Sequence, residues 1–215
     1  MKGVVSARCL VALMLVGSTF PTAHADILVM DGVEPWHICA ACHSLDGISV
    51  MARFPKLAGQ RPDYIVKQVR DFRAGRRHND GGQMQATASE IGDDDLARAA
   101  AYFGGLPAPT PNGRLATDSA EWTRGAALYR DGDVAAGILS CRSCHDDRDE
   151  NRPQGPFLKA QHAAYLAKQL RDWRSGERTN DESMVAIAAK LSEQDISALA
   201  TFLASQPRPD TQTAK

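Results

Sequence analysis

The chain has 215 residues with a formal net charge of −1, and 24% of its residues are charged. This balance includes no basic tract, so we expect no nucleic-acid partner. Hydrophobic residues make up 43% of the chain, and its five cysteines allow disulfides, metal binding or covalent cofactor attachment.

The chain begins with the three parts of a secretory signal peptide. Lys2 and Arg8 give a positive start, residues 9–16 are a short apolar run, and residues 23–25 (AHA) form a small-x-small cleavage site. We expect residues 1–25 to be removed on export, which lowers the formal charge to about −3. A retained membrane anchor is the alternative, but the apolar run is too short to span a bilayer.

After this leader the chain is a tandem duplication with an offset of 100 to 102 residues. CAACH at 39–43 recurs as CRSCH at 141–145, and YIVKQVRDFRAGRRHN at 64–79 recurs as YLAKQLRDWRSGERTN at 165–180. Three alternating prolines at 107, 109 and 111 cannot continue a helix and favour a stiff spacer. We therefore predict an N-terminal domain over 26–106, a linker over 107–112, a C-terminal domain over 113–206 and a flexible tail over 207–215.

Each copy has the apolar spacing of helices. Three positions in each copy lie on one helix face at i, i+4 and i+7: Ile65, Val69 and Phe72, then Leu166, Leu170 and Trp173. A final helix is predicted from about Asp93 in the first copy. In the second copy it follows the capping-box-like pair Ser192 and Asp195. No segment shows convincing strand alternation, so we predict an all-α fold.

The two CxxCH pentapeptides are signatures of covalent haem c attachment. Residues three apart lie on one side of a helical turn, so Cys39 and Cys42 can each bond one haem vinyl group. His43 then supplies a nitrogen ligand to the iron. The second copy repeats this set at Cys141, Cys144 and His145. We therefore predict two haem c groups, one in each copy.

Other uses of these four cysteines are weaker. Two disulfides would leave the adjacent histidines unexplained, and a Cys-x-x-Cys bridge is more typical of redox-active thiols. A zinc site with two cysteine pairs usually has them about 15 to 20 residues apart, whereas these pairs lie about a hundred apart.

The other axial ligand of each iron should recur in both copies. The histidines that could serve, His37, His78 and His162, have no histidine counterpart in the other copy. Met84 and Met184 do recur in a polar, loop-like setting before the last helix, 41 and 39 residues after His43 and His145. We therefore predict both methionines as ligands. Core packing is the alternative.

Residues near these sites have predicted roles with simpler alternatives. The carbonyls of Pro55 and Pro156 can accept a hydrogen bond from the proximal histidines, or the prolines are plain loop residues. The paired aromatic residues can wall the haems or only pack: Tyr64 and Tyr165, Phe72 and Trp173. Four arginines can meet haem propionates, although a solvated helix face is the better interpretation for most of them: Arg70, Arg73, Arg171 and Arg174.

These motifs together resemble the dihaem cytochrome c4 family over essentially the whole mature chain. They are CAACH and CRSCH, PKLAGQ, the YxxKQ(V/L)RD(F/W)RxGxRxN stretch and the methionine ahead of the last helix. The resemblance implies two cytochrome c-like domains related by a pseudo-twofold axis, with neighbouring haems at the interface. It also implies His/Met ligation by His43 with Met84 and by His145 with Met184, and periplasmic electron transfer toward a terminal oxidase.

Two departures from the repeat raise separate expectations. Residues 159–161 (KAQ) stand where the first copy has AGQ at 58–60, so this loop should approach its haem differently. The first copy also lacks a match to residues 125–129 (GAALY), the expected N-terminal helix of the second. Its haem should therefore be more exposed, or that surface should belong to a partner.

The leading prediction is a soluble electron carrier with no catalytic residue. Its expected donor is a quinol-oxidising cytochrome complex and its acceptor a terminal oxidase, with peripheral membrane association compatible with both. The alternative is the electron-accepting subunit of a periplasmic dehydrogenase for sulfide or an alcohol. A dihaem peroxidase is disfavoured, because it needs an iron with an open position and the paired methionines would fill it.

Overall fold

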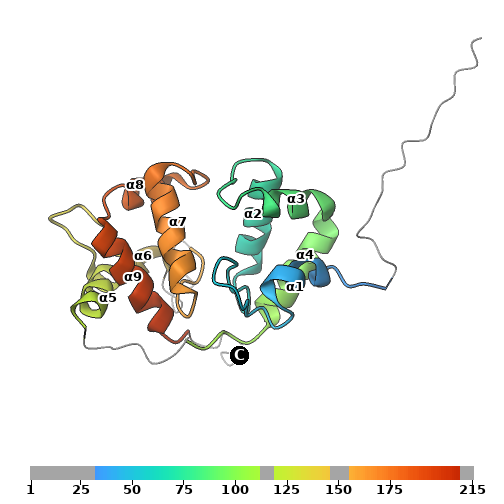
Figure 1. Cartoon of the computed structure of the whole chain (residues 1–215), viewed down its shortest axis with the longest axis horizontal. Helices are drawn as coiled ribbons and strands as arrows, with labels where there is room; N and C mark the ends of the chain where they lie inside the picture. The colour runs from blue at the N-terminus through green and yellow to red at the C-terminus, as the bar shows by residue number, and fades with distance from the viewer. Residues whose placement is uncertain (1–31, 112–118, 146–154, 209–215) are drawn as a thin grey trace, which may run out of the picture.

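The computed structural model describes residues 32–111, 119–145 and 155–208, and this part of the chain contains helices and no strand (Figure 1). The all-α prediction is therefore confirmed. None of the helices in these ranges is long and apolar enough to cross a membrane. The predicted signal peptide, the linker residue Asn112 and the tail from residue 209 lie outside the described residues.

The two copies of the repeat form two helical halves that lie side by side (Figure 1). The first half contains α1 (Trp36–His43), α2 (Pro62–Arg73), α3 (Gln83–Glu90) and α4 (Asp93–Gly105). The second half contains α5 (Ala120–Asp131), α6 (Arg142–His145), α7 (Ala163–Ser175), α8 (Glu182–Ala188) and α9 (Glu193–Ser205). Helices α2 and α7 face each other across the middle of the molecule.

The ends of several helices have a clear local cause in the sequence. Pro62 occupies the first turn of α2, where its missing N–H costs nothing. Gly176 ends α7 in the left-handed conformation that glycine adopts without strain. Ser192 and Asp195 form the predicted capping box at the start of α9, since each side chain accepts a hydrogen bond from the backbone N–H of the other.

Each half has its own apolar core. In the first half, Val69 and Phe72 of α2 pack with Leu96 and Ala99 of α4, and Phe103 is fully buried. In the second half, α5, α7 and α9 pack around one buried apolar cluster, which includes Leu128, Leu166, Ile196, Leu199, Phe202 and Leu203. Two separate cores explain how each copy of a short repeat can hold its own cofactor.

The halves differ at the helix that carries the CxxCH motif. In the first half a single helix, α1, packs on α4 and ends at His43. In the second half α5 packs on α9, and the motif lies separately on the short α6. The α5–α9 crossing is close at Gly125, because a Cβ there would overlap the backbone carbonyl of Ala198.

The loops over residues 58–60 and 159–161 have the same backbone conformation despite their different sequences. Gly59 has φ 59° and Ala160 has φ 57°, and their N–H groups donate to the carbonyls of Phe103 (2.7 Å) and Leu203 (3.0 Å). The two loops therefore share this backbone turn, and the different approach of the KAQ loop to its haem stays a prediction. The tertiary hydrogen bond holds Ala160 in a left-handed conformation that alanine rarely adopts.

Arg208 belongs to the segment predicted as a flexible tail, yet it is buried. Its guanidinium donates to the carbonyl of Ala58 (2.6 Å) and lies 4.9 Å from the ring centroid of Phe157. The chain therefore returns from the end of α9 to contact the first half.

Candidate functional site

One cavity of about 990 Å³ runs between the halves and contains every predicted site residue. This volume lies at the upper end of the range for small-molecule and cofactor sites, about 300–1,000 Å³. Its lining includes both CxxCH motifs and both paired methionines: Cys39, Cys42, His43, Met84, Cys141, Cys144, His145 and Met184. The structure thus brings the two predicted sets together, one from each half.

The four cysteines of the CxxCH motifs form no disulfide, so their sulfur atoms are available for thioether bonds. Cys39 and Cys141 are partly buried, and burial raises the pKa of each thiol to about 11. They are therefore protonated at neutral pH, unlike the low-pKa thiolates of thiol–disulfide enzymes. No group of three or more metal-binding side chains of His, Cys, Asp or Glu occurs in the described residues.

The proximal histidines are held in the same way in both halves. His43 Nδ1 lies 2.8 Å from the carbonyl oxygen of Pro55, and His145 Nδ1 lies 2.9 Å from that of Pro156. A carbonyl only accepts, so Nδ1 carries the proton and Nε2 keeps the lone pair that a metal needs. The predicted hydrogen bonds to the two prolines are confirmed.

His43 is more deeply buried than His145, with 5% of its surface exposed. Burial lowers the pKa of the His43 imidazole, although the hydrogen bond to Pro55 opposes this shift. A neutral imidazole is the form that can ligate iron. At the proximal histidine, the first site is therefore less exposed than the second.

Met84 and Met184 lie in the first turns of α3 and α8, not in loops as the sequence suggested. The backbone N–H of Met84 donates to the carboxylate of Asp80, and that of Met184 donates to Asp181 Oδ1 (3.0 Å). Asp181 is the N-cap of α8, and Asp80 makes an equivalent bond to the first turn of α3 from two residues before the N-cap Gly82. Both thioethers are partly buried on the cavity wall, each held at a repeated and capped position.

The other histidines have different roles. His37 and His78 are exposed, as expected for His37. His162 is buried between the halves, where its Nε2 lies 2.9 Å from the carbonyl oxygen of Ser49. Of the unpaired methionines, Met51 is half exposed, while Met30 lies outside the described residues.

The four arginines considered for haem propionates pair with acidic side chains instead. Arg70 and Arg73 both contact Asp93 at the start of α4. Arg171 and Arg174 both contact Glu193 at the equivalent position of α9. The simpler interpretation, a solvated helix face, therefore fits these residues.

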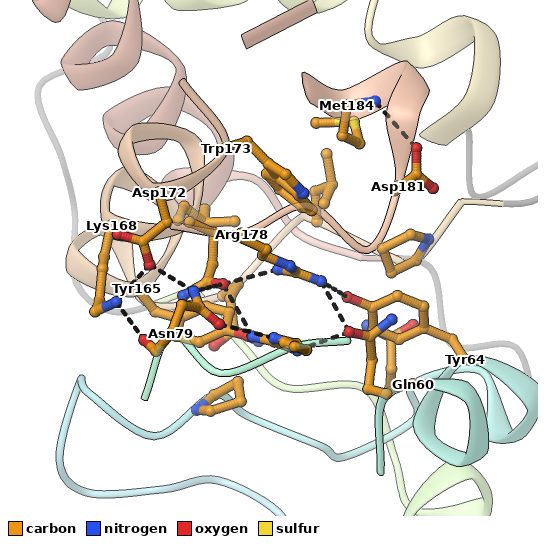
Figure 2. Close-up of a pocket in the computed structure, with 18 of the residues that line it drawn as sticks. Gln60, Tyr64, Asn79, Tyr165, Lys168, Asp172, Trp173, Arg178, Asp181 and Met184 are labelled. Carbon is orange, nitrogen blue, oxygen red and sulfur yellow. Dashed lines mark hydrogen bonds and ion pairs between the residues drawn. The ribbon is translucent and has the colours of Figure 1, made fainter. Parts of the chain in front are cut away.

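The contact between the halves depends on two buried arginines that sequence reasoning did not single out. Arg77 donates to Gln169 Oε1 (2.9 Å) and to the Tyr165 hydroxyl (3.1 Å) of the other half. Arg178 reciprocates with Gln68 Oε1 (2.9 Å) and the Tyr64 hydroxyl (3.3 Å) (Figure 2). Reciprocal contacts of this kind are produced by a twofold relation. The sequence did contain a signal for this contact, because both the arginine and the glutamine recur in the two copies of the repeat.

Two further glutamines extend this reciprocal arrangement. Gln60 exchanges two hydrogen bonds of 3.0 Å with the backbone of Phe157 in the second half. Gln161 does the same with the backbone of Lys56 in the first half, at 2.9 and 3.0 Å. The two loops that end in glutamine therefore connect the halves directly beside the proximal histidines.

The cavity has an excess of buried positive charge. Among the described residues, neither Arg77 nor Arg178 forms an ion pair with a carboxylate, although only 5% and 2% of their surfaces are exposed. Burial alone would raise the pKa of Tyr165, but the positive field of these arginines lowers it. Buried cations of this kind call for an anion. Haem c fits, because it combines an apolar ring with two carboxylates.

Comparison with known proteins also points to a haem-binding protein. A family model described as cytochrome C oxidase, cbb3-type, subunit III matches residues 37–103. The chain is 39% identical over 208 residues to cytochrome c4 of Azotobacter vinelandii, covering 91% of this chain and 97% of that protein. It is 34% identical to a thiosulfate dehydrogenase electron acceptor of Stutzerimonas stutzeri, covering 80% and 81%.

A solved structure has the same fold. The crystal structure of reduced recombinant cytochrome c4 from Pseudomonas stutzeri superimposes with a TM-score of 0.68 at 37% sequence identity. The match covers 78% of this chain and 93% of that one. The likeness thus extends over both halves rather than one domain.

Proposed function

The chain belongs to the cytochrome c4 family, and from this membership we propose which of its residues bind the two haem c groups of this electron carrier. Cys39 and Cys42 attach the haem of the first half, with His43 and Met84 as axial ligands. The second half uses the equivalent four: Cys141, Cys144, His145 and Met184. The observation that carries this assignment is the matched pair of histidine–proline hydrogen bonds, each placing the imidazole proton on Nδ1 beside the cysteines that line one cavity.

The protein fixes the positions of the ligand residues during electron transfer. Bound haem c supplies a one-electron ferric/ferrous couple. The prolines fix the imidazole planes, and the aspartate caps on α3 and α8 fix the methionine backbones. Thioether ligation favours a higher reduction potential than a second histidine. A site whose ligands do not move suits electron transfer, and no acid, base or nucleophile is required.

The proposal also covers the location, the domain bounds and the redox partners of this carrier. Residues 1–25 direct export to the periplasm, and the two haem domains are bounded as 26–106 and 113–206. The protein accepts electrons from a quinol-oxidising cytochrome complex and passes them toward a terminal oxidase. It acts as an electron-transfer protein without an enzymatic reaction of its own.

A second candidate function is the electron-accepting partner of a periplasmic dehydrogenase. It is favoured by the similarity to proteins named thiosulfate dehydrogenase electron acceptor in Stutzerimonas stutzeri and Thiomonas intermedia. The same two haem sites would serve this role. Co-purification with a larger catalytic chain would distinguish it from a free carrier.

The central test is mass spectrometry of the exported protein, followed by a redox titration. We expect cleavage after residue 25, added mass for two covalent haems and two high-potential one-electron transitions. The variant Cys141→Ser/Cys144→Ser should lose one haem and one transition while the first half keeps its own. An exported wild-type chain with no added mass would refute the assignment.

A further inference from the structure

Trp173 has a buried hydrogen-bond donor without a partner. Only 9% of its surface is exposed, and Nε1 has no acceptor among the described residues. The side chain lies on the cavity wall of the second half. A buried donor that is left unpaired loses its hydration and gains nothing in return, so native structures rarely keep one without a reason.

Another indole of the same half shows the usual outcome. Trp122 Nε1 donates to the hydroxyl of Ser205 at 2.9 Å. Trp173 lacks such a partner, although the neighbouring Arg178 guanidinium donates to Gln169, Asn180 and the Tyr64 hydroxyl. The missing acceptor is therefore expected to come from the group that the cavity binds.

The surroundings of Trp173 favour a negatively charged acceptor. The guanidinium of Arg178 stacks on its ring, 3.9 Å from the centroid, as Figure 2 shows. Arg178 is itself buried and donates to neutral oxygens. A cation over the ring face polarises the indole and strengthens its N–H as a donor. An anion beside this pair would offset the charge of the arginine as well.

We propose that the indole N–H of Trp173 donates a hydrogen bond to a propionate carboxylate of the haem in the second half. This inference rests on the proposed haem attachment. The periphery of haem c is otherwise apolar, and its two carboxylates are its strong acceptors. The thioether of Met184, also near this wall, is only a weak acceptor.

The first half cannot form this bond. Its equivalent residue is Phe72, which is buried under Arg77 at 4.4 Å from the ring centroid but carries no N–H. The hydrogen bond screens the negative charge that stabilises the ferric iron of the second haem. It therefore raises the reduction potential of that haem alone and makes two otherwise similar sites unequal.

The test is a redox titration of the Trp173→Phe holoprotein, with each haem assigned by the NMR signals of its ring methyl groups. We expect the ferric-to-ferrous ratio of the second haem to rise about three- to tenfold at a given potential, where tenfold is about 59 mV. The first haem should not change. The carboxylate, no longer hydrogen-bonded, should also titrate at higher pH, giving the second potential a stronger pH dependence.

Two matched variants complete the experiment. Trp122→Phe removes an indole that has a protein acceptor, so both potentials should stay as in the wild type. Phe72→Trp introduces the donor in the first half and should raise the first potential. Both haems present by mass with an unchanged second potential in Trp173→Phe would overturn the inference while leaving the proposed function intact. A chain without haem would instead overturn the function.

A measurement on the wild type covers the case in which Trp173→Phe does not retain its haem. The indole proton of Trp173 in the ferrous protein should shift as the carboxylate titrates. A signal that is insensitive to pH would overturn the inference. So would a variant in which the methionine–iron absorption changes and the pH dependence does not, because the acceptor would then be Met184.

Discussion

Arg77 and Arg178 face each other across the boundary between the halves as an antiparallel backbone bridge, and each guanidinium donates to a glutamine of the opposite half at 2.9 Å. The two positions are equivalent in the repeat. Equivalent segments of the two copies of the repeat therefore bind each other. This contact helps to set how the two CxxCH sites lie relative to one another.

Replacing Arg178 with methionine should weaken this boundary. Gln68 and Gln169 would each lose one of their buried donors, and Asn180 Oδ1 would lose the donor that Arg178 supplies; a buried acceptor left unpaired costs about 1–3 kcal/mol. We expect the free energy of unfolding of the holoprotein to fall by about 2–3 kcal/mol in urea. Arg171→Met is the control, because Arg171 pairs with Glu193 in solvent and should cost under about 1 kcal/mol. Equal effects of the two variants would contradict the role of Arg178.

Met84→Ala and Met184→Ala should each remove the methionine–iron absorption band of one haem. The remaining haem keeps its band, so each single variant should lose about half of the signal and the double variant all of it. Met51→Ala is the control, because Met51 is half exposed and away from the paired positions. Full persistence of the band in the double variant would show that the axial ligands are different residues.

The contact between the halves should weaken in acid because of Asp71. Burial raises the pKa of this carboxyl, but hydrogen bonds from Lys67, Asn180 and Arg76 outweigh it and bring the pKa below its usual value. A lowered pKa in the folded state stabilises the protein above the unfolded value, about 3.9, and this contribution is lost as pH falls through the lower folded value.

Thermal unfolding between pH 7 and pH 3 measures this effect. The wild type should lose stability steeply below about pH 4. Asp71→Asn should be less stable at pH 7 and should show a shallower acid slope. Parallel curves for the two proteins would rule out Asp71 as a source of the slope.

Gly125→Ala should force α5 away from α9. A Cβ at this position would overlap the backbone carbonyl of Ala198, which cannot move aside without shifting its helix. Overpacking of this kind costs about 1–3 kcal/mol. Gly105→Ala is the matched control, since a Cβ there meets nothing within 4 Å. Urea unfolding should therefore separate the variants, with Gly105→Ala at or above wild-type stability.

Local features of the fold were predictable from the sequence. The spacing of Ile65, Val69 and Phe72 identified α2, and Ser192 with Asp195 identified the start of α9. The proline carbonyls were one of two alternatives for Pro55 and Pro156, and the structure has them as the histidine partners. Each of these depends on interactions within a few residues or one loop.

Features set by distant residues were not predictable in the same way. Short helices around Met84 and Met184 were read as loops, because their aspartate caps stand among polar residues without a clear apolar face. The left-handed Ala160 depends on a hydrogen bond to Leu203, 43 positions away by the numbering. The roles of Arg77 and Arg178 required knowing that α2 and α7 face each other.

The return of the chain at Arg208 has a kinetic consequence. Because the segment after α9 contacts Ala58, the end of the second half is held against the first half in addition to the covalent connection between them. Tethering of this kind raises the effective concentration of each half for the other and suppresses hinge opening. Electron exchange between the haems is then expected to follow a single exponential, since one separation dominates the ensemble.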